Sequence, residues 1–268
     1  MKKVSIVLFV ATLFFACSKN AVTGRKQLKL FPESVLQDQA LTEYRSFLST
    51  NKVLSENVNK DAVMVRRVGL RISKCITDYY TAKGLGKELE NYKWEFKLVD
   101  NKEVNAWCMP GGKVVVYTGL LAVTQNEAAL AVVMGHEITH AVAHHGNERI
   151  SQVAIAEGFE VAGNIFTSGN QKANRLFNNV FAPAAQVGVL LPNSRKQELE
   201  ADRYGLNFAA MSGYNPNEAI PFWKRMSQAG GQKSPEFLAT HPSDDRRIVE
   251  LQRFMPEALS YYKPIGSK

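Results

Sequence analysis

Residues 127–145 read EAALAVVMGHEITHAVAHH, and this stretch decides the fold. Thr124 and Glu127 have the spacing of a capping box, which predicts a helix that begins at Thr124. Apolar residues occupy most of the following positions, so we expect the helix to be buried.

His136-Glu137-Ile138-Thr139-His140 lies inside this predicted helix. Four residues make slightly more than one helical turn, so His136 and His140 face the same side and can bind one zinc ion. Glu137, between them, can then act as a general base on a zinc-bound water. The alternative is a pair of core histidines, but burying two imidazoles and a carboxylate without a metal or partners is costly.

A catalytic zinc site needs a third protein ligand, and Glu198 is the best donor. Glu198 and Asp202 are four residues apart, so on a helix Glu198 can bind zinc while Asp202 accepts a hydrogen bond from a ligating imidazole. His144 diverges from the site if the helix is straight, and Glu200 faces away from it. The competing carboxylates are Glu148, Glu157 and Glu160.

Composition and charge restrict the class of protein. The chain has 268 residues, of which 45% are hydrophobic and 22% charged, so it can bury a substantial core. The net charge of +8 comes from basic residues that are scattered along the sequence, which argues against nucleic-acid binding.

The N-terminus has the pattern of an export signal. Lys2 and Lys3 precede an apolar run that stops at Cys17, and Ala16 before this cysteine is typical of a bacterial lipobox. We therefore expect residues 1–16 to be a lipoprotein-type signal peptide and Cys17 to carry a lipid; the alternative is ordinary secretory cleavage. Residues 17–32 are polar and are predicted to form the lipidated N-terminus and a tether.

The two remaining cysteines, Cys75 and Cys108, leave a choice open. They can form a disulfide in an oxidising compartment, or they can be two buried thiols.

Periodicity predicts an α+β fold that is mainly helical, with residues 33–268 forming one domain. A small sheet or hairpin should lie beside the central helix, because two predicted strands are joined by Pro110-Gly111-Gly112. Residues 147–191 are expected to form a helical hairpin interrupted near Gly169, which is either a lid or simple packing. The expected helices cover 35–48, 63–79, 194–211, 217–228 and 243–255, and the expected strands 94–98, 104–109 and 113–117.

Several separate motifs occur in the order in which the M48 zinc metallopeptidases have them, so the chain resembles this family. Within the family it resembles the periplasmic lipoprotein branch, which is BepA- and LoiP-like. This branch is related to the Oma-type and HtpX proteases. The motifs are NAVTGRKQL (20–28), Asn105-Ala106, Pro110-Gly111-Gly112, Gly119-Leu120-Leu121, the 127–145 helix, Ser194-Arg195, ELEAD (198–202), GYNP (213–216), THPS (240–243) and Arg247.

The resemblance implies a zincin fold of the gluzincin type, with one Zn²⁺ per chain. It makes His136, His140 and Glu198 the zinc ligands and Glu137 the general base. Asp202 does not bind the zinc itself but positions a ligating histidine through a hydrogen bond. His241 corresponds to a family histidine that approaches the zinc, either as an additional ligand or as a stabiliser of the oxyanion.

The resemblance also implies what such a site acts on. Residues 105–109 match an edge strand beside the cleft, where an extended substrate can add as a strand. The expected reaction is hydrolysis of peptide bonds, in which His241 or Arg247 stabilises the oxyanion.

The expected substrates are misfolded or misassembled cell-envelope proteins, and the expected place is the periplasmic side of a membrane, most simply the outer membrane, held through Cys17. The alternative is a zinc-binding envelope chaperone with a latent protease site.

Overall fold

The computed structural model describes residues 17–156, 170–181, 194–229, 237–238, 241 and 245–266. The predicted signal peptide (1–16) lies outside these residues, and so do Gly169, Glu157 and Glu160. Within the described part, none of the helices combines the length and the apolar character that crossing a membrane requires.

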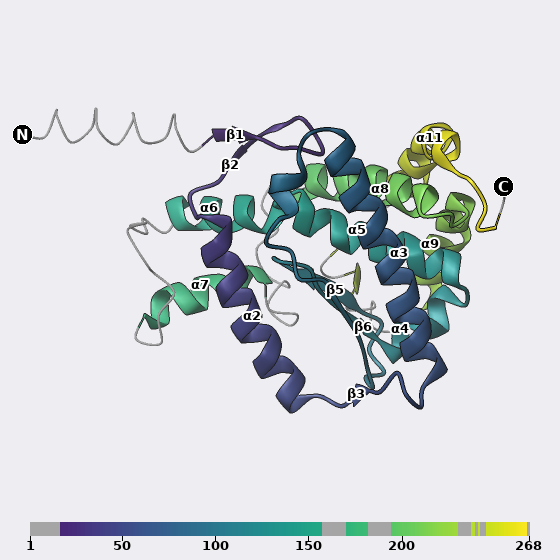
Figure 1. Ribbon diagram of the computed structural model, residues 1–268, viewed down its shortest axis with the longest axis horizontal. Coiled ribbons are helices and arrows are strands. Elements are labelled where there is room, and N and C mark those ends of the chain that lie inside the picture. Colours follow the sequence, from purple (N-terminus) through teal and green to yellow (C-terminus); the bar gives the residue numbers. More distant parts are fainter. Residues whose placement is uncertain are drawn as a thin grey trace, which may run out of the picture.

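Helices surround a small sheet (Figure 1), so the predicted α+β, mainly helical class is confirmed. The strands are β1 (Cys17–Lys19), β2 (Lys26–Leu28), β3 (Val53–Leu54), β4 (Glu95–Val99), β5 (Ala106–Met109) and β6 (Lys113–Tyr117). The helices are α2 (Glu33–Thr50), α3 (Lys60–Ala82), η1 (Gly86–Leu89), α4 (Thr118–Thr124), α5 (Glu127–Val142), α6 (His145–Ala156), α7 (Gln171–Phe181), α8 (Ser194–Met211), η2 (Pro216–Glu218), α9 (Ala219–Gln228) and α11 (Asp245–Tyr261).

The main sheet has the order β3-β4-β6-β5, which leaves β5 at an edge. β5 and β6 form the predicted antiparallel hairpin, and β4 pairs with β6 in parallel. Gly111 and Gly112 turn the hairpin with φ of 82° and 83°, a region that favours glycine. A side chain at Gly112 would also meet the Trp94 ring at 2.6 Å.

Each face of this sheet packs on its own hydrophobic core, because successive strand residues point to opposite faces. On one face, Val114 and Val116 of β6 join a core with α3, α5, α8, α9 and α11. On the other face, Val115 and Tyr117 join a core with α2, α6 and α7. Strand β5 contributes Trp107 to the second core, and its outer edge borders the site described below.

The central helix differs from its prediction at both ends. Asn126, not Thr124, caps α5 by accepting a hydrogen bond from the Ala129 N–H, while Thr124 ends the separate helix α4. Gln125 between them has φ of 63°, which breaks the helix there. α5 stops at Val142, and His144 has φ of 53°, so α6 starts in a new direction.

Residues 17–32 also differ from the predicted tether. β1 and β2 pair antiparallel and pack against the junction of α5 and α6. Buried Asn20 and Gln27 both donate hydrogen bonds to the Ala143 carbonyl, at 2.8 and 2.9 Å. That carbonyl lies past the end of α5, where no helical donor is available, so the two amides satisfy it.

Most of the other elements match their predictions. The expected helix over 194–211 is confirmed as α8. The helix predicted to end near residue 255 continues through Pro256 to Tyr261 as α11. Cys75 and Cys108 are free thiols, each partly buried, so the disulfide alternative was wrong.

Candidate metal centre

Helices α5 and α8 cross at a pair of glycines, and this contact brings the site together. A Cβ atom at Gly135 would lie 2.6 Å from the Gly205 carbonyl oxygen, and a Cβ atom at Gly205 would lie 2.6 Å from the backbone nitrogen of His136. The two backbones therefore approach closely. Glu198 and Asp202, earlier in α8, are thereby carried to the histidine face of α5.

Four buried side chains gather one ligand atom each within 4.8 Å: His136, His140, Glu198 and His241. The Nε2 atoms of His136 and His140 are 3.1 Å apart, and each lies 3.3–3.4 Å from a Glu198 oxygen. The His241 Nδ1 atom lies 3.2 Å from His136 Nε2 and 3.0 Å from Glu198.

These separations fit a tetrahedral zinc ion. Zn–N and Zn–O bonds of about 2.0–2.1 Å imply ligand-to-ligand distances of about 3.3–3.4 Å. His136 and His140 each use Nδ1 in a hydrogen bond with another residue, so their Nε2 lone pairs face each other at 3.1 Å. Such lone pairs repel unless a metal ion or a shared proton lies between them. The donor set of three imidazoles and a carboxylate suits zinc.

His136 is supported by a carboxylate. Its Nδ1 lies 2.9 Å from Asp202 Oδ1, which also accepts a hydrogen bond of 2.6 Å from the Arg247 guanidinium. Arg247 stacks 3.6 Å over the ring of Trp223 and is 4% exposed. Burial alone would lower the pKa of His136, but the hydrogen bonds with Asp202 and Glu198 raise it to about 9 in the metal-free site.

His140 is supported by another histidine. Its Nδ1 lies 2.9 Å from His145 Nδ1, and His145 Nε2 lies 3.0 Å from Glu200 Oε2. The Arg25 guanidinium then bridges Glu200 and Glu148. Because the Glu200 carboxylate accepts the His145 Nε2 proton, His145 Nδ1 accepts the His140 Nδ1 proton and leaves His140 Nε2 free for a metal.

This arrangement agrees with the comparison to known proteins. The sequence profile of Peptidase family M48 matches residues 71–255. The chain belongs to peptidase family M48. Members of this family use zinc, and the gathered residues match the predicted zinc ligands together with His241.

Relatives of this M48 chain include mitochondrial and bacterial proteins. The mitochondrial metalloendopeptidase OMA1 of Schizosaccharomyces pombe is 34% identical over 77% of this chain and 59% of its own length. OMA1 of Bos taurus is 31% identical over 94% of this chain and 49% of its own. The Beta-barrel assembly-enhancing protease of Yersinia pestis is 32% identical over 59% of this chain and 34% of its own length.

The chain thus spans roughly a third to three fifths of the length of these relatives. Both groups match, so the lipoprotein branch within the family stays a prediction.

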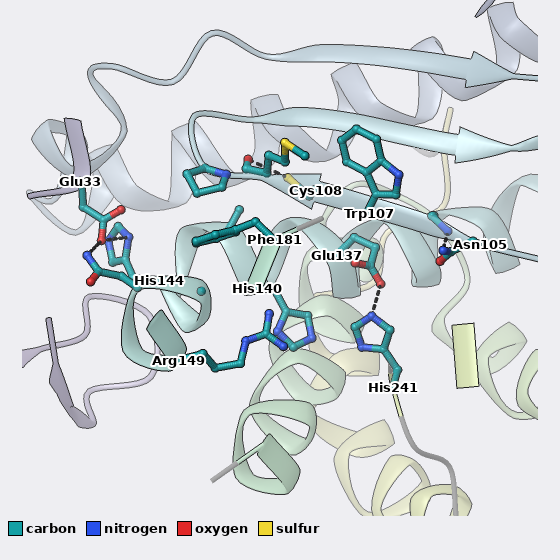
Figure 2. A pocket seen from close by; sticks show the side chains of 16 residues that line it. Glu33, Asn105, Trp107, Cys108, Glu137, His140, His144, Arg149, Phe181 and His241 are labelled. Carbon is teal, nitrogen blue, oxygen red and sulfur yellow. Dashed lines mark hydrogen bonds and ion pairs between the residues drawn. The ribbon is translucent and has the colours of Figure 1, made fainter. Parts of the chain in front are cut away.

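Glu137 and His241 are both buried and contact each other beside the M48 ligand cluster. His241 Nε2 lies 3.4 Å from Glu137 Oε1, and the contact is drawn in Figure 2. Burial raises the pKa of Glu137, which brings this carboxylate closer to the range of a general base at neutral pH. With His241 Nδ1 beside the metal position, the geometry corresponds to the additional-ligand alternative.

One predicted role needs correction. Arg247, one of the two expected oxyanion donors, is engaged with Asp202 and Trp223 and so positions Asp202. Glu200 lies outside the ligand cluster, as expected, but it binds His145, the hydrogen-bond partner of His140. The competing ligand Glu148 is bound by Arg25 and Gln197 and lies outside the cluster.

His144 is confirmed as a non-ligand. The reason differs from the expected one, because the chain bends after α5 and does not continue as a straight helix through His144. Its Nδ1 forms an ion pair of 3.0 Å with Glu33, on the side away from the metal position (Figure 2). His145, which sequence reasoning missed, was marked only by the doubled histidine before Gly146.

A narrow cleft lies between β5 and the metal ligands (Figure 2). Its interior volume is about 40 Å³, enough for a few water molecules. Trp107, Cys108 and Met109 of β5 form one wall, and His140 and His241 lie opposite. The predicted edge strand is therefore placed beside the ligands, where a peptide could add to it.

Proposed function

We propose that this chain is a zinc-dependent metalloendopeptidase that hydrolyses peptide bonds of misfolded or misassembled cell-envelope proteins. The ligand cluster with Glu137 beside it carries the proposal. The names of the relatives, metalloendopeptidase and Beta-barrel assembly-enhancing protease, support the reaction. The apolar leader that ends at Cys17 supports the envelope, with the chain held at a membrane, most simply the outer membrane.

His136, His140 and Glu198 would hold the zinc ion. Zinc bound by such ligands polarises a carbonyl group and lowers the pKa of water to about 7. Glu137 accepts the proton of the attacking water at its carboxylate and delivers it to the nitrogen of the leaving amine. His241 must leave its place beside the metal position for substrate to enter. Its Nε2–H, which lies near Glu137, can then donate a hydrogen bond to the developing oxyanion.

Zinc content and cleavage of unfolded casein test this reaction, in the wild type and in Glu137→Gln. We expect one zinc per chain in both proteins and cleavage that falls by about 10²–10⁴-fold in the variant, because the general base is lost. Glu90→Gln, at an exposed position, is the matched control and should cleave normally. Absence of zinc, or equal cleavage by Glu137→Gln, would overturn the proposal.

The narrow cleft and the position of His241 favour one second candidate, a zinc-binding envelope chaperone with a latent protease site. Cells that lack the protein separate the two functions. Rescue by Glu137→Gln as complete as rescue by the wild type would select the chaperone. Membrane fractions from the same cells test the anchor, because Cys17→Ala should release the chain.

A further inference from the structure

The cleft contains a cation that the proposed mechanism does not use. Arg149, on α6, lines the cleft together with His140, Glu137 and His241. Figure 2 shows its guanidinium directed toward the ring of His140. The neighbouring side chains on α6 point elsewhere, since Glu148 binds Arg25 and the residue after Arg149 joins the core under the sheet.

Arg149 has no partner among the described residues. Its Nε atom is buried without a hydrogen-bond partner, and none of the described carboxylates forms an ion pair with it. By contrast, Arg25, Arg203 and Arg247 each form an ion pair of 2.5–2.7 Å. Burial disfavours the charged guanidinium and lowers the pKa of Arg149, so its position is costly. A group that enters the cleft can offset that cost.

The charges around Arg149 favour an anion. Glu198 and Glu137 are the carboxylates whose charges act on it. A bound divalent zinc ion formally cancels these two negative charges. Arg149 then leaves this part of the cleft with a net positive charge, in surroundings where a charge-assisted hydrogen bond is strong.

We propose that Arg149 binds a carboxylate of the peptide substrate next to the scissile bond, so that the enzyme prefers substrates with an acidic group at that position. The inference rests on the proposed peptidase function and adds a substrate class to it. The planar guanidinium suits a carboxylate because two parallel hydrogen bonds can form.

Arg149 lies toward one end of β5, so it should contact substrate residues on one side of the scissile bond only. The first end of β5 is near His241, because the Phe237 N–H donates to the Val104 carbonyl and the Phe237 ring stacks on His241 at 4.7 Å. The other end leads into the turn beside α2, whose first residue, Glu33, binds Asn147 on α6. Arg149 therefore lies toward the Met109 end of the strand.

A peptide series tests the inference with the full chain. Quenched fluorogenic peptides, blocked at both ends, carry one Glu, Gln or Lys at successive positions on either side of the cleaved bond. We expect a single position where Glu raises kcat/KM at least about 10-fold over Gln, since a charge-assisted bond replaces a neutral one. A second set with a free terminal carboxylate and no Glu shows whether a side chain or a chain end supplies the anion.

Three variants assign the preference to Arg149. Arg149→Met should abolish it, Arg149→Lys should keep part of it, and Arg149→Glu should favour Lys over Glu. Zinc content and the melting temperature verify that each variant is folded. Arg66→Met, at an exposed arginine on α3, is the matched control and should leave the preference unchanged.

The outcomes separate this inference from the proposed function. If Arg149→Met slows all peptides equally, Arg149 binds a main-chain carbonyl and the inference is wrong, although the peptidase stands. If the wild type cleaves no peptide, the proposed function is in doubt, and binding to Glu137→Gln decides the inference. Fluorescence anisotropy should then still show tighter binding of the Glu peptide than of the Gln peptide; equal binding would overturn it.

Discussion

His136 and His140 project from one helix toward one metal position, but they are held by different neighbours. His136 donates directly to the carboxylate of Asp202, which a buried arginine holds in turn. His140 donates to a neutral imidazole, and its carboxylate, Glu200, is one residue further away. The first support comes from α8 and α11, the second from α6, α8 and the N-terminal hairpin formed by β1 and β2.

The two pKa values differ accordingly. The pKa of His136 is raised to about 9 despite burial, because two carboxylates contact it. The pKa of His140 lies well below its usual value, since burial outweighs the attraction of Glu198. A carboxylate in direct contact raises the basicity of a ligating imidazole more than one that acts through a second ring. His136 should thus be the more strongly supported ligand.

The largest effect is expected from Asp202→Ala. Zinc affinity should fall by about 10–100-fold, because His136 loses the group that fixes its tautomer. The free energy of unfolding should fall by about 1.5–3 kcal/mol, since Arg247 loses its charge-assisted hydrogen bond with this carboxylate. Chelator competition and urea unfolding measure the two quantities. Asp202→Asn keeps the shape and isolates the charge; wild-type zinc affinity in both variants would contradict the interpretation.

A smaller effect is expected from Glu200→Gln. The amide oxygen can still accept from His145, but the charge behind His140 and the ion pair with Arg25 are lost, and zinc affinity should fall by about 10-fold. The comparison is with Asp202→Asn in the same chelator assay. Glu257→Gln, which removes the carboxylate of the outer pair with Arg203, is the control and should bind zinc normally. A loss as large as that of Asp202→Asn would show that the two supports are equivalent.

The difference between the supports also explains what the sequence could predict. Asp202 follows Glu198 by four residues on one helix, so a regular period places both on one face. His145 reaches His140 only because α5 ends at Val142 and His144 takes a φ of 53°. A straight helix from 127 to 145 would direct His145 elsewhere. Local periodicity cannot predict such a bend, and His145 and Glu200 were missed for that reason.

The N-terminal hairpin shows the same limit. Its polar residues predicted a tether, but Asn20 and Gln27 satisfy a carbonyl at the bend after α5, and Arg25 reaches two carboxylates far along the chain. Polar side chains are typical of loops when only local sequence is considered. Their partners here lie more than a hundred residues away, so only the folded chain reveals them.

The smallest effect concerns His144, whose ion pairs hold the same bend from its outer side. Its Nδ1 and Nε2 lie 3.0 Å from Glu33 and 3.5 Å from Glu88, and Lys29 is the nearby cation that opposes its charge. Burial alone would lower the pKa of His144, but the two carboxylates raise it above 6.5. The folded state therefore binds this proton more tightly than the unfolded state does.

The direction of the pH dependence of stability follows from that difference. Stabilisation by protonated His144 is complete below pH 6.5 and is lost as the pH rises through the raised folded-state value. We expect the wild type to exceed His144→Asn in free energy of unfolding by on the order of 1 kcal/mol at pH 6, with a smaller difference at pH 9. Asparagine tolerates the positive φ, so the variant preserves the bend. Urea unfolding of both zinc-saturated proteins across this range measures the difference. A difference that stays constant or grows with pH would mean that packing at the bend, and not the charge of His144, stabilises the turn that delivers His145 to His140.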